Sequence, residues 1–168
     1  MIFKFKFFLY KKKFTFDINL KNLKMVIVQR FYKDNEFLFK KMIEIRKKVF
    51  IEEQGVDKKL EFDDDENIIF SYYLVWKDLV PIATGRWKLT KKGVKLERFA
   101  VLPEHRNLKI GAFLLKKILE DISFKKEKVY LHSQESALNF YKRNGFKKIG
   151  KSFLEANILH YEMIFVKN

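Results

Sequence analysis

The chain has 168 residues, of which 17% are aromatic and 34% are charged, and its formal net charge is +15. This length suffices for one compact domain with a full hydrophobic core, and the scarcity of Gly and Pro argues against a disordered chain. There is no cysteine, which excludes disulfides, thiolate metal sites and a cysteine acyl-enzyme. With three His and no HExxH-like pair we expect no metal site, and we expect a protein of a reducing, cytoplasmic compartment.

The positive charge is unevenly distributed along the chain. Residues 52–66 hold eight carboxylates against two lysines, a net −6, so the remainder carries +21. An excess of this kind favours anionic partners. No nucleic-acid-binding motif accompanies it, so we expect a Lys-rich solvated surface and no nucleic-acid partner. The acidic run 63–66 is not a calcium loop, because Ile68 and Leu74 stand where Gly and Glu are required.

Residues 1–24 differ from the rest of the chain. They begin with alternating Phe and Lys and then become basic, and the apolar stretch is too short and interrupted for a membrane span. We interpret them as a dispensable basic and aromatic extension before a domain at 25–168. A transit peptide and a weak membrane-surface tail are the alternatives, without stable membrane insertion.

Apolar periodicity predicts the remaining elements in chain order. The spacing of Leu38, Met42, Ile45 and Val49 indicates a helix, whereas short runs of β-branched and aromatic residues indicate strands. We expect strand 25–31, helix 36–50, an acidic loop or broken helix, strands 70–76, 82–89 and 94–102, a helix from about 109 to 122, strand 128–132, helix 135–144 and strand 157–166. This order is typical of an α/β (α+β) fold with one twisted, mostly antiparallel sheet and helices on both faces.

The segment 96–112 is the most informative part of the chain. A buried strand ends at Pro103, a basic loop follows, and a helix begins near Lys109. Free backbone N–H groups and the positive end of a helix dipole attract phosphate at such a position. Arg106 and Lys109 add charge there, so the segment predicts a phosphate-binding loop at the start of a helix.

Several motifs in order resemble the GCN5-related N-acetyltransferase (GNAT) superfamily. They are the loop at 106–112 and the run NFYKRNGF at 139–146, and the likeness covers residues 25–166. The runs VFIEEQGV (49–56), LERFAVLP (96–103), LHSQ (131–134) and ILH (158–160) resemble a small-enzyme branch that includes the apicomplexan glucosamine-6-phosphate N-acetyltransferases.

This resemblance implies a sheet of six or seven strands with four helices, in which the fourth and fifth strands splay apart around acetyl-coenzyme A (acetyl-CoA). The pyrophosphate motif is Arg/Gln-x-x-Gly-x-Gly/Ala, and this chain has Lys109 where the first Gly usually stands. The resemblance therefore implies acetyl-CoA as co-substrate and no metal. The residues implied to hold it are Phe99, Ala100, Val101, Arg106, Lys109, Ile110, Gly111, Ala112, Gln134, Phe140 and Arg143.

For catalysis, the resemblance implies that Tyr141 protonates the leaving thiolate. Phenol and thiol pKa values, about 10 and about 8.5, suit this transfer. The amine must lose a proton, and Glu97 on the central strand is our candidate base, directly or through a water. His132 and His160 are alternative bases or substrate contacts, and a structural network of Glu97 with Arg98 or a lysine is equally consistent with the sequence.

The acceptor side is less well defined by the sequence. Glu53 and Gln54, after the first helix, form an acceptor wall in this branch, and Arg98, His132 and His160 are further substrate-binding candidates. Arg46, Arg86 and Arg98 are each able to bind an acceptor phosphate bidentately.

The function we expect is transfer of acetyl from acetyl-CoA to a small-molecule amine, with glucosamine 6-phosphate as the acceptor in UDP-N-acetylglucosamine synthesis. The alternatives are an acetyltransferase for a polyamine or protein lysine, and a non-catalytic CoA- or nucleic-acid-binding module. Many members of the superfamily are dimers, so the resemblance is compatible with a homodimer.

Overall fold

The computed structural model describes residues 2–3, 8–9, 12–19, 24–62, 67–123 and 127–166. One mixed sheet runs through it in the order β1-β3-β4-β5-β6-β7-β8-β10-β9, with β2 paired to β3. The strands are β1 (Ile2–Phe3), β2 (Phe8–Leu9), β3 (Lys12–Asn19), β4 (Lys24–Phe31), β5 (Phe70–Lys77), β6 (Val80–Thr90), β7 (Gly93–Val101), β8 (Val129–Gln134), β9 (Phe146–Glu155) and β10 (Ile158–Phe165).

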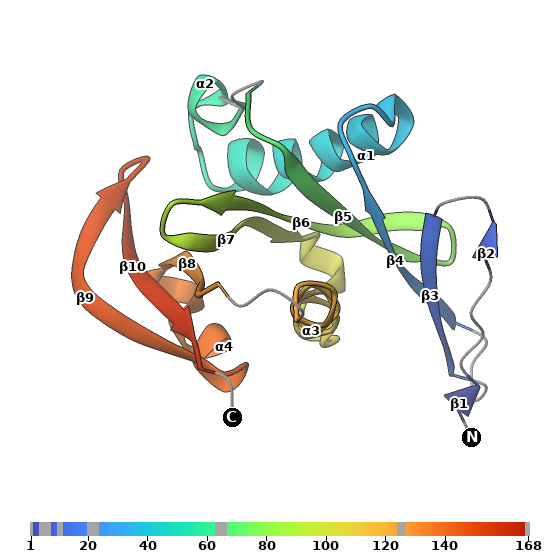
Figure 1. The fold of residues 1–168 in the computed structure, drawn as a ribbon. Coiled ribbons are helices and arrows are strands. Elements are labelled where there is room, and N and C mark those ends of the chain that lie inside the picture. Colours follow the sequence, from blue (N-terminus) through green and yellow to red (C-terminus); the bar gives the residue numbers. More distant parts are fainter. Residues whose placement is uncertain are drawn as a thin grey trace.

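Helices cover both faces of this sheet, as the sequence predicted (Figure 1). One face carries α1 (Glu36–Arg46), the π-helical segment η1 (Lys47–Glu53) and α2 (Lys58–Glu61). The other carries α3 (Ile110–Asp121) and α4 (Leu138–Arg143). Short 3₁₀ turns precede these two helices, η2 (Pro103–His105) before α3 and η3 (Glu135–Ala137) before α4.

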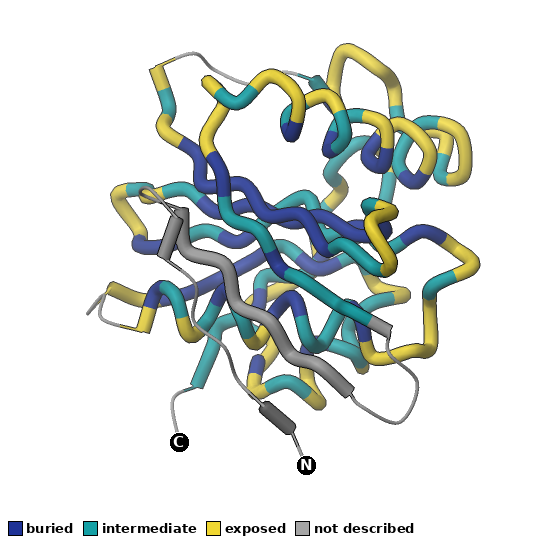
Figure 2. Tube along the Cα trace, turned by 90° about the vertical axis from the view of Figure 1, so that its right-hand side faces the viewer, coloured by how far each residue is buried: buried dark blue, intermediate teal, exposed yellow. Residues whose placement is uncertain are grey.

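The core lies in two layers, one on each side of the central strands. Val75, Ile82, Leu96, Leu114 and Ile118 belong to the layer between the sheet and α3. The layer under α1 contains, among others, Leu38, Met42, Ile45, Leu74 and Leu102. The central strands are therefore buried on both faces, as the tube coloured by burial shows (Figure 2).

Local sequence explains where α1 begins and which face it buries. The Asn35 side chain accepts a hydrogen bond from the Leu38 N–H at 3.1 Å, an N-cap that satisfies one free donor of the first turn. Leu38, Met42 and Ile45, three and four residues apart, form the buried stripe.

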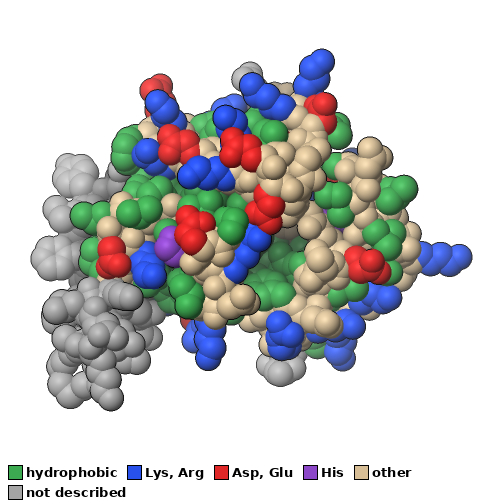
Figure 3. Space-filling model, turned by 180° about the vertical axis from the view of Figure 1, so that it is seen from behind, with side chains coloured by type: hydrophobic (Ala, Val, Ile, Leu, Met, Phe, Trp, Pro, Cys, Tyr) green, Lys and Arg blue, Asp and Glu red, His purple; other side chains and the backbone are tan. Residues whose placement is uncertain are grey.

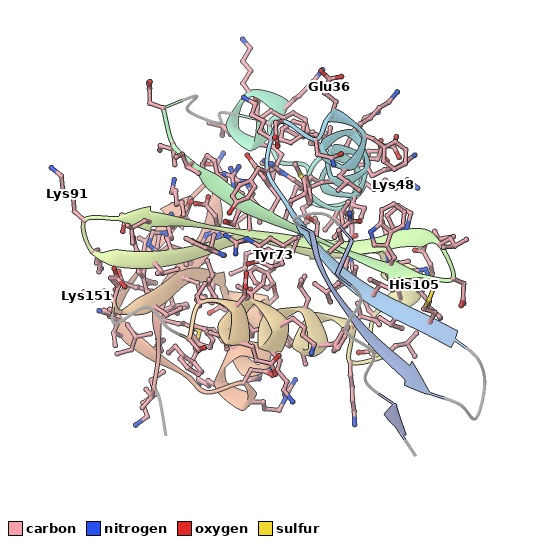
Figure 4. All side chains as sticks on the ribbon, turned by 45° about the vertical axis from the view of Figure 1, so that its right-hand side comes forward. Glu36, Lys48, Tyr73, Lys91, His105 and Lys151 are labelled. Carbon is pink, nitrogen blue, oxygen red and sulfur yellow. The ribbon has the colours of Figure 1, made fainter. Side chains whose placement is uncertain are left out.

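A buried polar network fixes α3 to the sheet. The Tyr73 hydroxyl donates to the Asp121 carboxylate at 2.5 Å and accepts from the Trp87 indole N–H at 3.0 Å. The Arg30 guanidinium donates to the same carboxylate at 2.9 Å. Burial, and then the Asp121 carboxylate, raise the pKa of Tyr73, which keeps the phenol protonated as a donor. Tyr73 accordingly lies at the middle of the molecule, between sheet and helix (Figure 4).

The register of β7 determines where the sheet opens. Among the described strands, β7 and β8 are the one parallel pair, and they pair over only three positions, from Val94↔Val129 to Leu96↔Leu131. Beyond these, β7 contains one extra residue, since Thr84 and Arg86 face Ala100 and Glu97. Arg98, in the extra stretch, has φ of +57°. A bulge of this kind bends a strand and redirects its side chains, so β7 and β8 separate here.

Two of the predicted boundaries are wrong. The first helix does not continue as an α-helix to residue 50, because it becomes π-helical at Lys47 and extends to Glu53. The predicted helix 135–144 is a 3₁₀ turn followed by α4.

Four strands were missed: β1, β2 and β3, which lie in the segment interpreted as an extension, and β9. Of these, β9 lies within the predicted domain. It is an edge strand with little buried surface, and Lys147, Lys148, Gly150 and Lys151 interrupt any apolar alternation. Such a strand carries no clear period-two signal.

The N-terminal segment extends the sheet through β3, which pairs antiparallel with β4 from Phe14↔Gln29 to Asn19↔Lys24. That residues 1–24 are dispensable stays a prediction. The acidic run 63–66 lies outside the described residues. Within the described ranges, no helix has the length and hydropathy that a bilayer crossing needs.

Replacing Gly93 with Ala will destabilise the fold strongly. Gly93 has φ of +132°, and a Cβ there would lie 2.2 Å from the backbone carbonyl oxygen of Lys128, where β8 begins to pair with β7. We expect a loss of about 3 kcal/mol in the free energy of unfolding, measured in urea. Gly150→Ala is the control: φ is +67° but no atom lies within 4 Å, so the loss is about 1 kcal/mol. Equal losses for both variants would contradict the steric argument.

Candidate active site

A cavity of ≈ 140 Å³ lies where β7 and β8 separate. It is walled by residues 95–99 of β7, residues 132–134 of β8, Phe50, Gln54 and Val56 from η1 and the turn after it, Glu61 of α2, Ala137 and Tyr141 on the α4 side, and Glu155, Ala156, Ile158 and His160 around the β9–β10 turn. Of the predicted site residues it brings together Gln54, Glu97, Arg98, Phe99, His132, Gln134, Tyr141 and His160.

The predicted phosphate loop lies at the start of α3. Asn107 and Lys109 both have φ of +61°, so the loop turns through two left-handed residues before the helix begins at Ile110. Lys109 is the N-cap and no side chain caps the helix, so the N–H groups of Ile110, Gly111 and Ala112 begin the helix without a side-chain acceptor. These N–H groups fit a pyrophosphate. Lys109 thus adopts a left-handed backbone conformation, which favours glycine.

Arg106, predicted to bind the pyrophosphate, is instead paired with the carboxylate of Glu53. Its guanidinium makes two hydrogen bonds to the Glu53 carboxylate, at 2.7 and 2.6 Å, and a third from Nε to the Val101 carbonyl at 3.0 Å. The hydrogen bond from Arg106 lowers the pKa of Glu53 and outweighs its slight burial. The pair ties the end of η1 to the loop before α3, so Glu53 belongs to the loop side rather than to the cavity wall.

The edge of β7 that faces the opening is available to a ligand. Phe99, Ala100 and Val101 lie beyond the last β7–β8 pair, so β8 provides no partners for backbone groups on that edge. An extended acyl-pantetheine chain can hydrogen-bond to such an edge as an added strand would. Gly85, on the neighbouring strand, makes room for the Phe99 ring, because a Cβ there would lie 3.3 Å from that ring.

Tyr141 reaches the cavity from α4. It is 8% exposed and packs edge-on against Phe99, Phe140 and Phe146, with ring centroids 4.9–6.4 Å apart. Burial raises the pKa of Tyr141, so the phenol carries its proton at neutral pH. Phe140, its neighbour, packs beside Gly111, and Arg143 is exposed on the last turn of α4.

Glu97 is a buried ion-paired carboxylate. It contacts Arg86 Nη2 at 3.1 Å and Lys88 Nζ at 3.3 Å, while Arg86 lies over the Phe70 ring at 3.9 Å. Burial alone raises the pKa of Glu97, but Arg86, Lys88 and Lys95 outweigh it, so this pKa is below its usual value. Of the two networks expected from sequence, the structure shows the one with a lysine, since Arg98 pairs with Glu61 instead.

Two of the three candidate phosphate-binding arginines do not line the cavity. Arg46 is fully buried, with Nε 2.5 Å from a Glu61 carboxylate oxygen, and it also donates to the Glu61 backbone carbonyl. Arg86 is 3% exposed and paired with Glu97. Arg98 lines the cavity and contacts the second Glu61 oxygen at 3.1 Å. Of these three arginines, Arg98 is therefore the one that lines the cavity.

Sequence reasoning missed Glu155, which the structure places beside His132. The two side chains lie 2.9 Å apart, Nδ1 to Oε2. The hydrogen bond from His132 lowers the pKa of Glu155 to about 2, against burial that raises it. Glu155 is the last residue of β9, which was not predicted from the sequence. The sequence signal that could have drawn attention to Glu155 is its position directly before the turn Ala156–Asn157.

The π-helical segment η1 brings the acceptor wall to β8. Gln134 Nε2 donates to Gln54 Oε1 at 2.9 Å, which connects the turn after η1 with the end of β8. π-helical turns are rare and occur often at functional sites. No group of three or more His, Asp or Glu in the described residues is arranged to hold a metal ion.

Comparisons with known proteins identify the family of this chain. The sequence model of the acetyltransferase (GNAT) domain family matches residues 41–167. The chain belongs to the GNAT acetyltransferase family. The N-acetyltransferase YjcF of Bacillus subtilis, itself uncharacterised, is 32% identical over 132 residues, which are 77% of this chain and 94% of YjcF. The chain is therefore an acetyl-CoA-dependent N-acetyltransferase.

Solved structures show the same fold. ElaA of Escherichia coli aligns with a TM-score of 0.74 and 24% identity, over 83% of this chain and 99% of ElaA. An aminoglycoside 6'-N-acetyltransferase complexed with coenzyme A aligns with a TM-score of 0.64 and 13% identity, over 84% and 98% of the two chains. The predicted fold, with its splayed parallel pair, is confirmed.

Lys109→Gly will stabilise the protein. A left-handed backbone costs a lysine about 1 kcal/mol, whereas glycine adopts it freely. We therefore expect the free energy of unfolding, measured in urea, to rise by about 1 kcal/mol. Lys116→Gly, on the exposed side of α3, is the matched control and should cost about 1 kcal/mol. A loss of stability in Lys109→Gly would show that the lysine side chain stabilises the loop.

The Glu155–His132 pair gives stability a specific pH dependence. Because the pKa of Glu155 is lowered from 4.5 to about 2, the pair stabilises the fold above pH 4.5 and loses this contribution as pH falls toward 2. We expect the stability difference between the protein and Glu155→Gln to shrink over this range in urea titrations. A difference that does not change between pH 5 and 2.5 would contradict the pairing.

Proposed function

We propose that this enzyme transfers acetyl directly from acetyl-CoA to a primary amine held in the cavity between β7 and β8, with Tyr141 as the general acid. The supporting observation is the position of Tyr141, whose buried ring lies beside Phe99 where the two strands separate. Acetyl-CoA supplies an activated thioester. The N–H groups that begin α3 hold its pyrophosphate, and the free edge of β7 holds its pantetheine.

Acid catalysis by Tyr141 follows from its environment. Departure of coenzyme A leaves a thiolate, which a protonated phenol nearby neutralises. Because burial raises the pKa of Tyr141, the phenol still carries its proton at neutral pH. Tyr141 belongs to α4, which lies on the opposite face of the sheet from α1 and α2 (Figure 1), so the acid and the acceptor wall reach the cavity from different elements.

We propose glucosamine 6-phosphate as the acceptor, giving N-acetylglucosamine 6-phosphate for UDP-N-acetylglucosamine synthesis. Two observations support it. Arg98 and Lys95 line the cavity and can bind the phosphate, and the amides of Gln54 and Gln134 can hydrogen-bond to sugar hydroxyls. The absence of cysteine supports work in a reducing, cytoplasmic compartment.

A cationic acceptor such as a polyamine or a lysine side chain is the second candidate. Glu61, Glu97 and Glu155 all line the cavity, and carboxylates attract an ammonium group. Each of them is already paired with Arg or His side chains, which reduces the charge left for a substrate. Binding to nucleic acid has less support, because Lys and Arg on the face seen in Figure 3 alternate with Asp and Glu instead of forming one basic patch.

Release of free thiol from acetyl-CoA distinguishes these acceptors. We expect turnover with glucosamine 6-phosphate, and little with unphosphorylated glucosamine because the phosphate contacts are lost. Turnover with spermine or a lysine peptide, and none with the sugar phosphate, would replace the proposed acceptor with the cationic one. No thiol release with any amine would refute catalysis and favour a CoA-binding module.

Tyr141→Phe will lower kcat by about 10²-fold, because the thiolate then leaves unprotonated. The KM for acetyl-CoA should stay within about twofold, since the ring and its packing remain. Tyr161→Phe, which removes a hydroxyl near Glu135 outside the cavity wall, is the matched control and should keep full activity. Equal activity of the Tyr141 variant and the control would exclude the acid role.

A further inference from the structure

His132 and Glu155 form an oriented pair inside the proposed active site. His132 projects from β8 and Glu155 from the end of β9, and both line the cavity that contains Tyr141. His132 Nδ1 lies 2.9 Å from Glu155 Oε2. The His132 side chain is 26% exposed, so a substrate or water can reach it.

The carboxylate determines which ring nitrogen carries the proton. An ionised carboxylate only accepts hydrogen bonds, so Nδ1 of His132 donates and holds the hydrogen of the neutral ring. Nε2 then has a free lone pair. Within the described part of the chain no group is hydrogen-bonded to this nitrogen. A neutral imidazole in this state accepts a proton at Nε2, and Glu155 stabilises the resulting cation.

The surroundings hold this ring in one orientation. Phe153 contacts the His132 ring edge-on, with centroids 4.8 Å apart, and Tyr130 lies on its strand at 6.2 Å. Directly after Glu155, Ala156 and Asn157 have φ of +50° and +60°. A left-handed backbone is energetically unfavourable for alanine. The surrounding structure therefore holds the tight turn that follows Glu155 in place against this strain.

The other two candidate bases are less suitable. Glu97 lies among Arg86, Lys88 and Lys95, and these cations stabilise its ionised form and weaken it as a proton acceptor. His160 is 9% exposed, and its Nδ1 donates to the Ile158 carbonyl at 2.8 Å, a neutral acceptor. A buried imidazolium without a carboxylate partner is unfavourable.

We propose that His132 is the general base that deprotonates the acceptor amine, and that Glu155 is the positioning residue that orients it. This inference rests on the proposed function, and it assigns the proton acceptor for that reaction. His132, Gln134 and Gln54 lie on the side of the sheet that η1 covers, whereas Tyr141 comes from α4 on the other side. Base and acid thus approach the reacting carbon from opposite sides of the opening.

The proton balance is complete with these two residues. The ammonium group of the acceptor gives one proton to His132 Nε2, which passes it to solvent. The nitrogen lone pair then forms the C–N bond to the acetyl carbonyl carbon, and the C–S bond breaks with its electron pair on sulfur. Tyr141 protonates the sulfur. The new amide nitrogen then releases its surplus proton, which returns to the Tyr141 oxygen.

The charged environment of His132 comes from several elements. Groups that line the same cavity or face the ring across the strand pairs are Lys95, Glu97 and Arg98 of β7, Glu61 of α2, Tyr141 of α4, Glu155 of β9, and His160 and Glu162 of β10. Since several groups titrate here, the pH profile must be read against variants of each candidate base. If His132 is the base, kcat/KM rises with pH as its ring loses a proton, and that limb is absent from the His132 variant alone.

The experiment compares His132→Ala, Glu155→Gln, His160→Ala and Glu97→Gln with the unaltered protein, using acetyl-CoA and the best acceptor. We expect His132→Ala to lose about 10²-fold in kcat, and Glu155→Gln about tenfold, with the KM for acetyl-CoA within about twofold. Added imidazole should restore part of the activity of His132→Ala and leave His160→Ala unchanged. His105→Gln, which removes an imidazole outside the cavity wall, should keep full activity.

Two results would overturn the assignment. One is a His132→Ala variant with unaltered kcat/KM while Glu97→Gln loses the pH limb. The other is a ¹⁵N NMR spectrum in which the neutral His132 ring carries its proton on Nε2 instead of Nδ1. The NMR measurement needs no turnover, so it tests the His132–Glu155 pair even without a known acceptor. A failure to find any acceptor would count against the proposed function and not against this pair.

Discussion

The active site depends on one interruption in strand pairing. β7 and β8 pair in parallel over only three positions, and the extra residue at Arg98 then turns β7 away. Backbone donors and acceptors beyond that point need other partners, because unpaired polar groups are costly when water is excluded. An extended ligand can pair with this edge, and α4 on one side and η1 on the other bring side chains to the same cavity. Without the separation, α4 and η1 would face opposite sides of a closed sheet.

Buried charge is concentrated on one side of that opening. Arg46 and Arg98 pair with Glu61, and Arg86 pairs with Glu97. Of these side chains, Glu61, Glu97 and Arg98 line the cavity, and Arg46 and Arg86 are buried behind them. Buried pairs of this kind contribute little net stability, because desolvation offsets the attraction, but removing one partner leaves an uncompensated charge. The network therefore acts mainly to hold Arg98 and Glu97 in fixed positions around the substrate. The carboxylate of Glu155 differs, because its partner is a titratable imidazole rather than a permanent cation.

Sequence and structure agree where a segment buries many apolar side chains and differ where it buries few. β5 and β6 contain continuous buried runs and α3 buries one stripe, so their positions could be predicted within a few residues. β9 buries little besides Phe146, so no pattern revealed it, and Glu155 was missed with it. The motif around residues 106–112 predicted a phosphate loop at the start of α3, but the Arg106–Glu53 pair joins residues 53 positions apart, which local spacing cannot show. The change from α- to π-helix at Lys47 depends on hydrogen-bond register, which composition does not encode.

The π-helical segment also makes the length of this region unusually important. An α-helix turns by about 100° per residue, so deleting one residue between α1 and Gln54 would let the segment rewind and rotate everything after it. Gln54 would leave Gln134, and Glu53 would leave Arg106, so both the cofactor loop and the acceptor wall would lose a partner from one deletion. Helices elsewhere on a surface tolerate small changes in length at their ends. In this segment a single insertion or deletion would separate the two halves of the site while leaving every side chain chemically intact.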